Sequence, residues 1–126
     1  MVTIGLDYGR KRTGVAVCLG ELILPLEPVH GGWDSIIHRL SSLSEKYSGV
    51  RVVMGLPLSD TGKPTELSRE VEKLANRLRN SGYTVETVNE VRSSLEAADL
   101  LGGSDRKGHI DSVAACEILK RHTGVV

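Results

Sequence analysis

The sequence predicts an α/β fold in which a five-stranded mixed sheet carries helices on both faces. Two features support this fold class. Three apolar stretches follow one another closely near the N-terminus, with short turns between them, as in an antiparallel meander. Farther along the chain, apolar runs alternate with segments of helical periodicity, which is typical of parallel strands joined by helices. The 126 residues are enough for one domain, which we expect to cover residues 1–126.

The meander is expected to contain strands at residues 2–7, 14–19 and 22–26. In the first of these, large apolar side chains alternate with small or polar ones, which is the period of a strand. The third stretch contains Pro25 and is followed by Pro28. Because proline has no backbone N–H group to donate, we expect this strand to end there and to lie at an edge of the sheet.

The rest of the chain is expected to alternate between helices and strands. Apolar residues recur at helical spacing between residues 36 and 47, with Asp34 as a possible N-cap. Pro57 should stop a central strand, and Pro64 should open the second helix. The strands are expected at residues 50–56 and 83–88, and the later helices from residue 93 to the glycines at 102 and 103 and from residue 111 to residue 122.

The composition is that of a globular protein, with 40% hydrophobic and 25% charged residues. The apolar runs are too short to cross a bilayer and no secretory leader precedes the first strand, so we expect a cytoplasmic protein. Cys18 and Cys116 lie in apolar patterns and are expected to be buried thiols. The formal net charge is zero. This counts against tight non-specific binding to nucleic acid, but it allows a local basic rim around a cation site.

Three acidic residues are the candidates for chemistry. Asp7 ends the first strand, where a carboxylate desolvates badly and needs a cation or a hydrogen-bond donor. Glu90 follows the fifth predicted strand, and the carboxyl ends of parallel strands form the ligand-binding edge of an α/β sheet. Asp111 shares a helix face with Ala115 and Ile118, which should pack on the sheet. Taken singly, the three could instead be a residue bonded to the hairpin, a solvated loop residue and an N-cap.

Together, the three carboxylates predict a site for hard divalent cations. Converging carboxylates repel one another unless cations neutralise them, and an all-oxygen donor set suits Mg²⁺ or Mn²⁺. Two such ions about 4 Å apart can activate water and stabilise the leaving oxygen in phosphodiester cleavage. Basic residues near each acid could hold the flanking phosphates, although the first three could equally form an ordinary exposed turn. They are Arg10, Lys11 and Arg12 beside Asp7, Arg92 beside Glu90, and Arg106 and Lys107 before Asp111.

Four sequence blocks resemble the bacterial pre-16S ribosomal RNA nuclease family, whose members are also called Holliday junction resolvases. The match runs in order over nearly the whole chain. The blocks are Gly5-Leu6-Asp7-Tyr8-Gly9 with Lys11-Arg12 and Gly14 to Val17, Val53 to Leu58 with Thr61-Gly62, Asn89-Glu90 with Ser93-Ser94 and Glu96-Ala97, and Lys107 with Asp111 to Ala115 and Ile118-Leu119.

The resemblance implies an RNase H-like fold and a metal-dependent endonuclease in which Asp7, Glu90 and Asp111 are the catalytic and metal-binding acids. It also implies structured RNA or branched DNA as the partner, and a role in processing the 5′ end of pre-16S rRNA on the small-subunit precursor. The chain departs from the family pattern at Asn89, where an aspartate is usual, and at Val91, where an arginine is usual. These changes keep open a non-catalytic module that docks on nucleic acid or ribosomes. The opening block also resembles the first phosphate loop of actin-like ATPases and sugar kinases, which leaves an ATP-binding domain as a further alternative.

Overall fold

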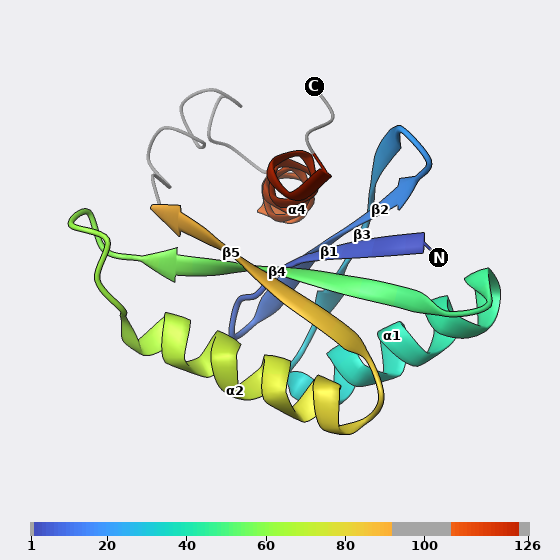
Figure 1. Ribbon diagram of the computed structural model, residues 1–126, viewed down its shortest axis with the longest axis horizontal. Helices are drawn as coiled ribbons and strands as arrows, with labels where there is room; N and C mark the ends of the chain where they lie inside the picture. Colours follow the sequence, from blue (N-terminus) through green and yellow to red (C-terminus); the bar gives the residue numbers. More distant parts are fainter. Residues whose placement is uncertain (1, 92–106, 124–126) are drawn as a thin grey trace.

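The computed structural model describes residues 2–91 and 107–123, and the side chains of residues 2–90 and 112–123. The strands form a five-stranded sheet in the order β3-β2-β1-β4-β5. Helix α4 crosses one face of the sheet, and α1 and α2 run along the other (Figure 1). The predicted fold class is therefore confirmed. The elements are β1 (Val2–Asp7), β2 (Arg12–Leu19), β3 (Leu22–His30), α1 (Trp33–Tyr47), β4 (Val50–Leu58), α2 (Glu66–Asn80), β5 (Thr84–Val91) and α4 (Lys107–Thr123).

The sheet combines the expected antiparallel meander with parallel strands. Strand β2 pairs antiparallel with β1 and with β3, whereas β4 pairs parallel with β1 and with β5. The carboxyl ends of β1, β4 and β5 therefore meet at one edge of the sheet. In open α/β sheets this is the edge where ligands bind.

Strand β3 is longer than predicted and passes through both prolines to His30. It lies at the edge of the sheet, as expected, so it needs ladder hydrogen bonds on one side only. Its register with β2 shifts between Thr13 and Val15, opposite Pro28, which gives that proline an irregular position. The longer β3 also lengthens β2, because Arg12 now pairs with His30.

Two helix starts and one strand end also differ from the predictions. Gly32 is the N-cap of α1, and Asp34 lies in the first turn, where a carboxylate interacts favourably with the helix dipole. Strand β4 continues through Pro57 to a bridge between Leu58 and Pro64. Helix α2 therefore begins after Pro64, and a capping box between Thr65 and Ser68 closes its first turn.

The ends of β5 and α4 bear directly on the candidate acids. Strand β5 extends to Val91, so Glu90 lies inside the strand and not in the loop after it. Helix α4 begins at Lys107, so Asp111 lies in the second turn and is not its N-cap. Lys107, which was expected to precede the helix, is therefore its first residue. The expected helix after residue 93, together with Arg92 and Arg106, lies outside the described residues.

The core has two parts, one on each face of the sheet. The larger part fills the space between the sheet and α1 and α2, and the smaller part lies beneath α4. Cys18 and Cys116 belong to the smaller part and are buried, as expected. Gly5 lets α4 approach closely, because a Cβ atom at this position would lie 2.9 Å from the carbonyl oxygen of Ala115. Among the helices that the structure describes, none has the length and apolar character to span a membrane.

Candidate functional site

Asp7 ends β1 with its carboxylate on the face of the sheet that α4 covers. Side chains alternate along a strand, so Asp7 shares its face with Gly5, which touches Ala115 and Leu119 of α4. The residue is only 5% exposed. A carboxylate this deeply buried needs hydrogen-bond donors or cations around it. The position is that of the predicted acid at the ligand-binding edge.

Glu90 reaches the same face from β5. Its Oε2 atom lies 2.7 Å from the point where a Cβ atom on Gly55 would stand. Ile118 of α4 lies against the same point, with its Cδ1 atom 2.6 Å away. The carboxylate of Glu90 is therefore folded back over the backbone of β4, next to α4, in space that any larger residue at position 55 would occupy.

The strand register brings the two acids to one corner of the sheet. Leu6 pairs with Met54, so the following residues, Asp7 and Gly55, stand at the same level on adjacent strands. Adjacent strands lie about 4.8 Å apart. The carboxylate of Glu90 lies over Gly55, and Asp7 stands beside Gly55 on the adjacent strand, so both acids belong to this corner. This donor set fits a hard divalent cation, which carboxylates bind well.

The third predicted acid lies on the helix above this face. Asp111 is one helical turn before Ala115, whose side chain is buried. The side chain of Asp111 is outside the described part of the structure. Among the described side chains, no three His, Cys, Asp or Glu residues are grouped to hold a metal ion. The structure thus places Asp7 and Glu90 at the same corner of the sheet, and the metal site that they would form with Asp111 stays a prediction.

Hydrogen bonds from Ser112 and His122 connect α4 to the sheet at different points along the helix. Near its start, the hydroxyl group of the buried Ser112 donates to the carbonyl oxygen of Leu26 in β3, at 2.7 Å. Near its end, His122 Nε2 contacts the carboxylate of Glu86 in β5. Together with the close packing at Gly5, these contacts hold α4, the helix that contains Asp111, against the sheet.

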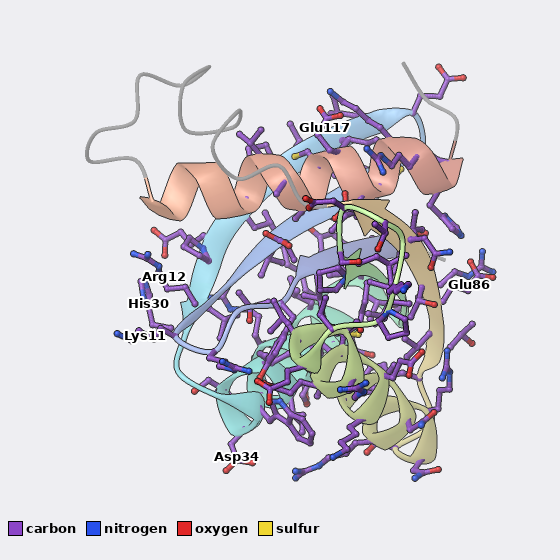
Figure 2. All side chains as sticks on the ribbon, turned by 90° about the vertical axis from the view of Figure 1, so that its left-hand side faces the viewer. Lys11, Arg12, His30, Asp34, Glu86 and Glu117 are labelled. Carbon is purple, nitrogen blue, oxygen red and sulfur yellow. The ribbon has the colours of Figure 1, made fainter. Side chains whose placement is uncertain are left out.

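The predicted basic residues lie in two different places. Lys11 and Arg12 lie with His30 at one end of the sheet, on the side where α4 begins (Figure 2). Arg10 instead contacts Glu70 of α2, on the opposite face of the sheet. Lys107 is the first residue of α4. Lys11 is thus an exposed basic residue close to the corner that holds Asp7, and Arg12 beside it is half-buried.

Sequence reasoning missed three residues that shape this region. Gly55 interrupts an apolar strand, and an isolated glycine in a strand often marks a close approach of another group. His30 pairs with Arg12 across the sheet, but only the unexpected length of β3 reveals this pairing. Glu70 lies in a strongly charged helix, and the pattern there does not distinguish it from its neighbours.

The fold defines the class of protein. The structure resembles that of RuvC from Thermus thermophilus, with a TM-score of 0.55, 14% identity and coverage of 99% of this chain and 98% of the other. The same enzyme in complex with a Holliday junction substrate gives a TM-score of 0.59 at 15% identity, with coverage of 99% and 97%. The chain thus has the RNase H-like fold of RuvC, as the sequence predicted.

Sequence comparison identifies the family. The profile of RuvX, described as a Holliday junction resolvase, matches residues 1–122. A protein of Chlorobaculum tepidum named "Putative pre-16S rRNA nuclease" is 34% identical over 93% of this chain and 89% of its own length. A protein of Bordetella pertussis with the same name is 33% identical, over 94% of this chain and 90% of its own length. The chain belongs to the RuvX family.

Proposed function

We propose that this chain is a divalent-metal-dependent endonuclease that hydrolyses phosphodiester bonds at the 5′ end of pre-16S rRNA. One observation supports the proposal: the carboxylate of Glu90 lies over Gly55, and the strand register puts Asp7 at the same level as Gly55 on the adjacent strand. The names of the relatives support rRNA as the substrate. Such processing would take place in the cytoplasm, by a single nuclease domain that spans residues 1–126.

In this proposal, Asp7, Glu90 and Asp111 are the metal-binding and catalytic carboxylates. Two Mg²⁺ or Mn²⁺ ions held by these acids would supply a nucleophilic water at neutral pH and neutralise charge on the phosphate. Asp7 is held rigidly by its place at the end of a buried strand. Glu90 approaches from β5, which is separated from β1 by β4 alone. The helix that carries Asp111 covers the corner from above. These acids bind and orient the reacting groups, and we expect the product to carry a 5′-phosphate.

Basic residues around the corner would bind the nucleic acid backbone. Lys11 and Arg12 lie on the side of the sheet where α4 begins (Figure 2), and His30 lies beside them. Arg92, Arg106 and Lys107 belong to the same proposed surface because they flank Glu90 and Asp111 in the sequence. Contacts to phosphates position a substrate without reading its sequence. Specificity would then come from the shape of the RNA.

The experiment is a cleavage assay on a pre-16S rRNA 5′ fragment with Mn²⁺, Mg²⁺ or a chelator. We expect cleavage with either metal, none with the chelator, and none by Asp7→Asn. The control is Asp60→Asn, because Asp60 is exposed in the turn between β4 and α2. Circular dichroism of both variants would show that they are folded. Full activity of Asp7→Asn would contradict the proposed site.

The second candidate function is resolution of Holliday junctions, which is the description of the matching family. The same acids would serve it, because hydrolysis of a DNA phosphodiester needs the same groups. A four-way DNA junction in the same assay, at equal concentration, separates the two candidates. We expect faster cleavage of the rRNA fragment, and preference for the junction would favour the resolvase.

A further inference from the structure

Arg10 is bound on the far side of the sheet from the candidate site. Its Nε atom donates to both carboxylate oxygens of Glu70, at 2.9 and 3.2 Å, and its Nη2 atom also contacts this carboxylate. The carboxylate of Glu66 lies 3.8 Å from Nη2. A bidentate pairing of a guanidinium with a carboxylate is among the strongest side-chain contacts, and it fixes the orientation of both groups.

The same glutamate also holds Tyr8. The hydroxyl group of Tyr8 donates to Glu70 Oε1 at 3.1 Å and accepts from Trp33 Nε1 at 3.1 Å. Tyr8 is buried in the core, and it directly follows Asp7. Glu70 therefore binds Tyr8 and Arg10, two residues of the short loop that directly follows Asp7.

The loop between these contacts is tightly closed. A Cβ atom on Gly9 would lie 2.2 Å from the carbonyl oxygen of Arg12, so no larger residue fits there. The hydroxyl group of Thr13 donates to the carbonyl oxygen of Gly9 at 3.3 Å. Glu70 thus binds the loop after Asp7 on one side, and Thr13 binds it on the other.

We propose that Arg10 is a positioning residue, which with Glu70 fixes the loop after Asp7, and that it is not one of the phosphate contacts. This inference rests on the proposed nuclease function. A phosphate brought to Arg10 would meet the carboxylates of Glu66 and Glu70, which would repel it. Lys11, the next residue along, is exposed at the end of the sheet where α4 begins (Figure 2). In this basic loop, Arg10 thus anchors the site and Lys11 binds the substrate.

The test compares Arg10→Gln with Lys11→Gln, since each removes one positive charge from the same loop. Binding to a labelled rRNA fragment is measured at several salt concentrations without metal. A lost phosphate contact reduces the slope of log affinity against log salt by about 0.7 to 0.9. We expect this reduction for Lys11→Gln and an unchanged slope for Arg10→Gln. An equal reduction in both would overturn the inference.

Activity gives the complementary result. We expect Arg10→Gln to lower kcat by about 10- to 100-fold with little change in KM, because small misplacements of catalytic groups cost this much. The exchanged pair Arg10→Glu with Glu70→Arg should recover part of the lost kcat. A phosphate contact could not be rescued in this way, because the exchange places a carboxylate in the basic loop. Failure of the exchanged pair to improve on Arg10→Glu alone would count against positioning.

Amide hydrogen exchange keeps this inference separate from the proposed function. We expect faster exchange at Tyr8 and Gly9 in Arg10→Gln, and unchanged exchange there in Lys11→Gln. This measurement needs neither metal nor nucleic acid. If the wild-type chain bound and cleaved no nucleic acid, the proposed function would fail. Unchanged exchange in Arg10→Gln would overturn the anchoring role of Arg10 by itself.

Discussion

The Oε2 atom of Glu90 lies 2.7 Å from the point where a side chain on Gly55 would begin. Ile118 of α4 closes on the same point from above, with its Cδ1 atom 2.6 Å away. The absence of a side chain at position 55 thus leaves room for both the candidate ligand Glu90 and the helix that carries Asp111. The strand register places Asp7 beside this gap.

Gly55→Ala should therefore damage the corner. The added methyl group would overlap Glu90 and Ile118, and overpacking of this kind costs about 1–3 kcal/mol of unfolding free energy. We also expect a large loss of cleavage, because the Glu90 carboxylate must move away from Asp7. Urea denaturation and the rRNA cleavage assay measure the two effects.

A second variant separates stability from positioning. Ile118→Val removes the Cδ1 atom that meets the new methyl group, so the double variant Gly55→Ala with Ile118→Val should regain stability while cleavage stays low. The control is Ser41→Ala, because Ser41 is at an exposed position of α1. Wild-type cleavage by Gly55→Ala would show that Glu90 does not need this space.

Ser112→Ala should loosen the docking of α4. Its hydroxyl group is buried and donates to the carbonyl oxygen of Leu26 at 2.7 Å. Loss of such a bond leaves a buried acceptor without its donor and costs about 1–3 kcal/mol. Thermal or urea unfolding measures the change. Ser42→Ala, at an exposed position of α1, is the control and should change stability little.

Thr65→Val should weaken the junction between β4 and α2. The hydroxyl group of Thr65 accepts from the backbone N–H of Ser68 at 3.1 Å and donates to the carbonyl oxygen of Pro57 at 3.0 Å. Valine keeps the shape and removes both bonds. Loss of an N-cap costs about 0.5–2 kcal/mol. Urea denaturation tests this, with the exposed Thr87→Val as the control; equal stability of the two variants would contradict the role of the cap.

The order and type of the described elements could be predicted from the sequence because hydrophobic period and turn residues are local signals. Pro28 and Pro57 misled the prediction for a physical reason. An edge strand needs hydrogen bonds on one side only, and β4 continues through Pro57 into a short bridge at Leu58. A proline marks the end of a strand only where its missing N–H group is needed.

The site could be predicted in part for a similar reason. Asp7 is a polar residue in an apolar strand, which is visible in the sequence. The closeness of Glu90 to Asp7 depends on the strand register and on Gly55, and neither can be derived from local pattern. The partner of Arg10 was also invisible, because Glu70 is distant in sequence and lies on a helix with many charges. Such long-range charge pairs are decided by how α2 packs.

The Glu70 carboxylate should make stability depend on pH. Its hydrogen bond with Arg10 lowers the pKa of Glu70 below the ordinary value, with a smaller contribution in the same direction from the hydroxyl group of Tyr8. A group with a lowered folded-state pKa stabilises the protein when it is ionised in both states. This contribution is complete at neutral pH. It is lost as the pH falls below the usual range of a glutamate, about 4, and through the folded-state pKa.

The measurement is the unfolding free energy of the wild type and of Glu70→Gln from pH 7 down to about pH 3. We expect the wild type to be more stable at neutral pH and the difference to shrink as Glu70 becomes protonated. Glu72→Gln, at an exposed position of the same helix, controls for the loss of one negative charge. A difference between wild type and Glu70→Gln that stayed constant over this range would show that the pairing with Arg10 does not stabilise the loop after Asp7.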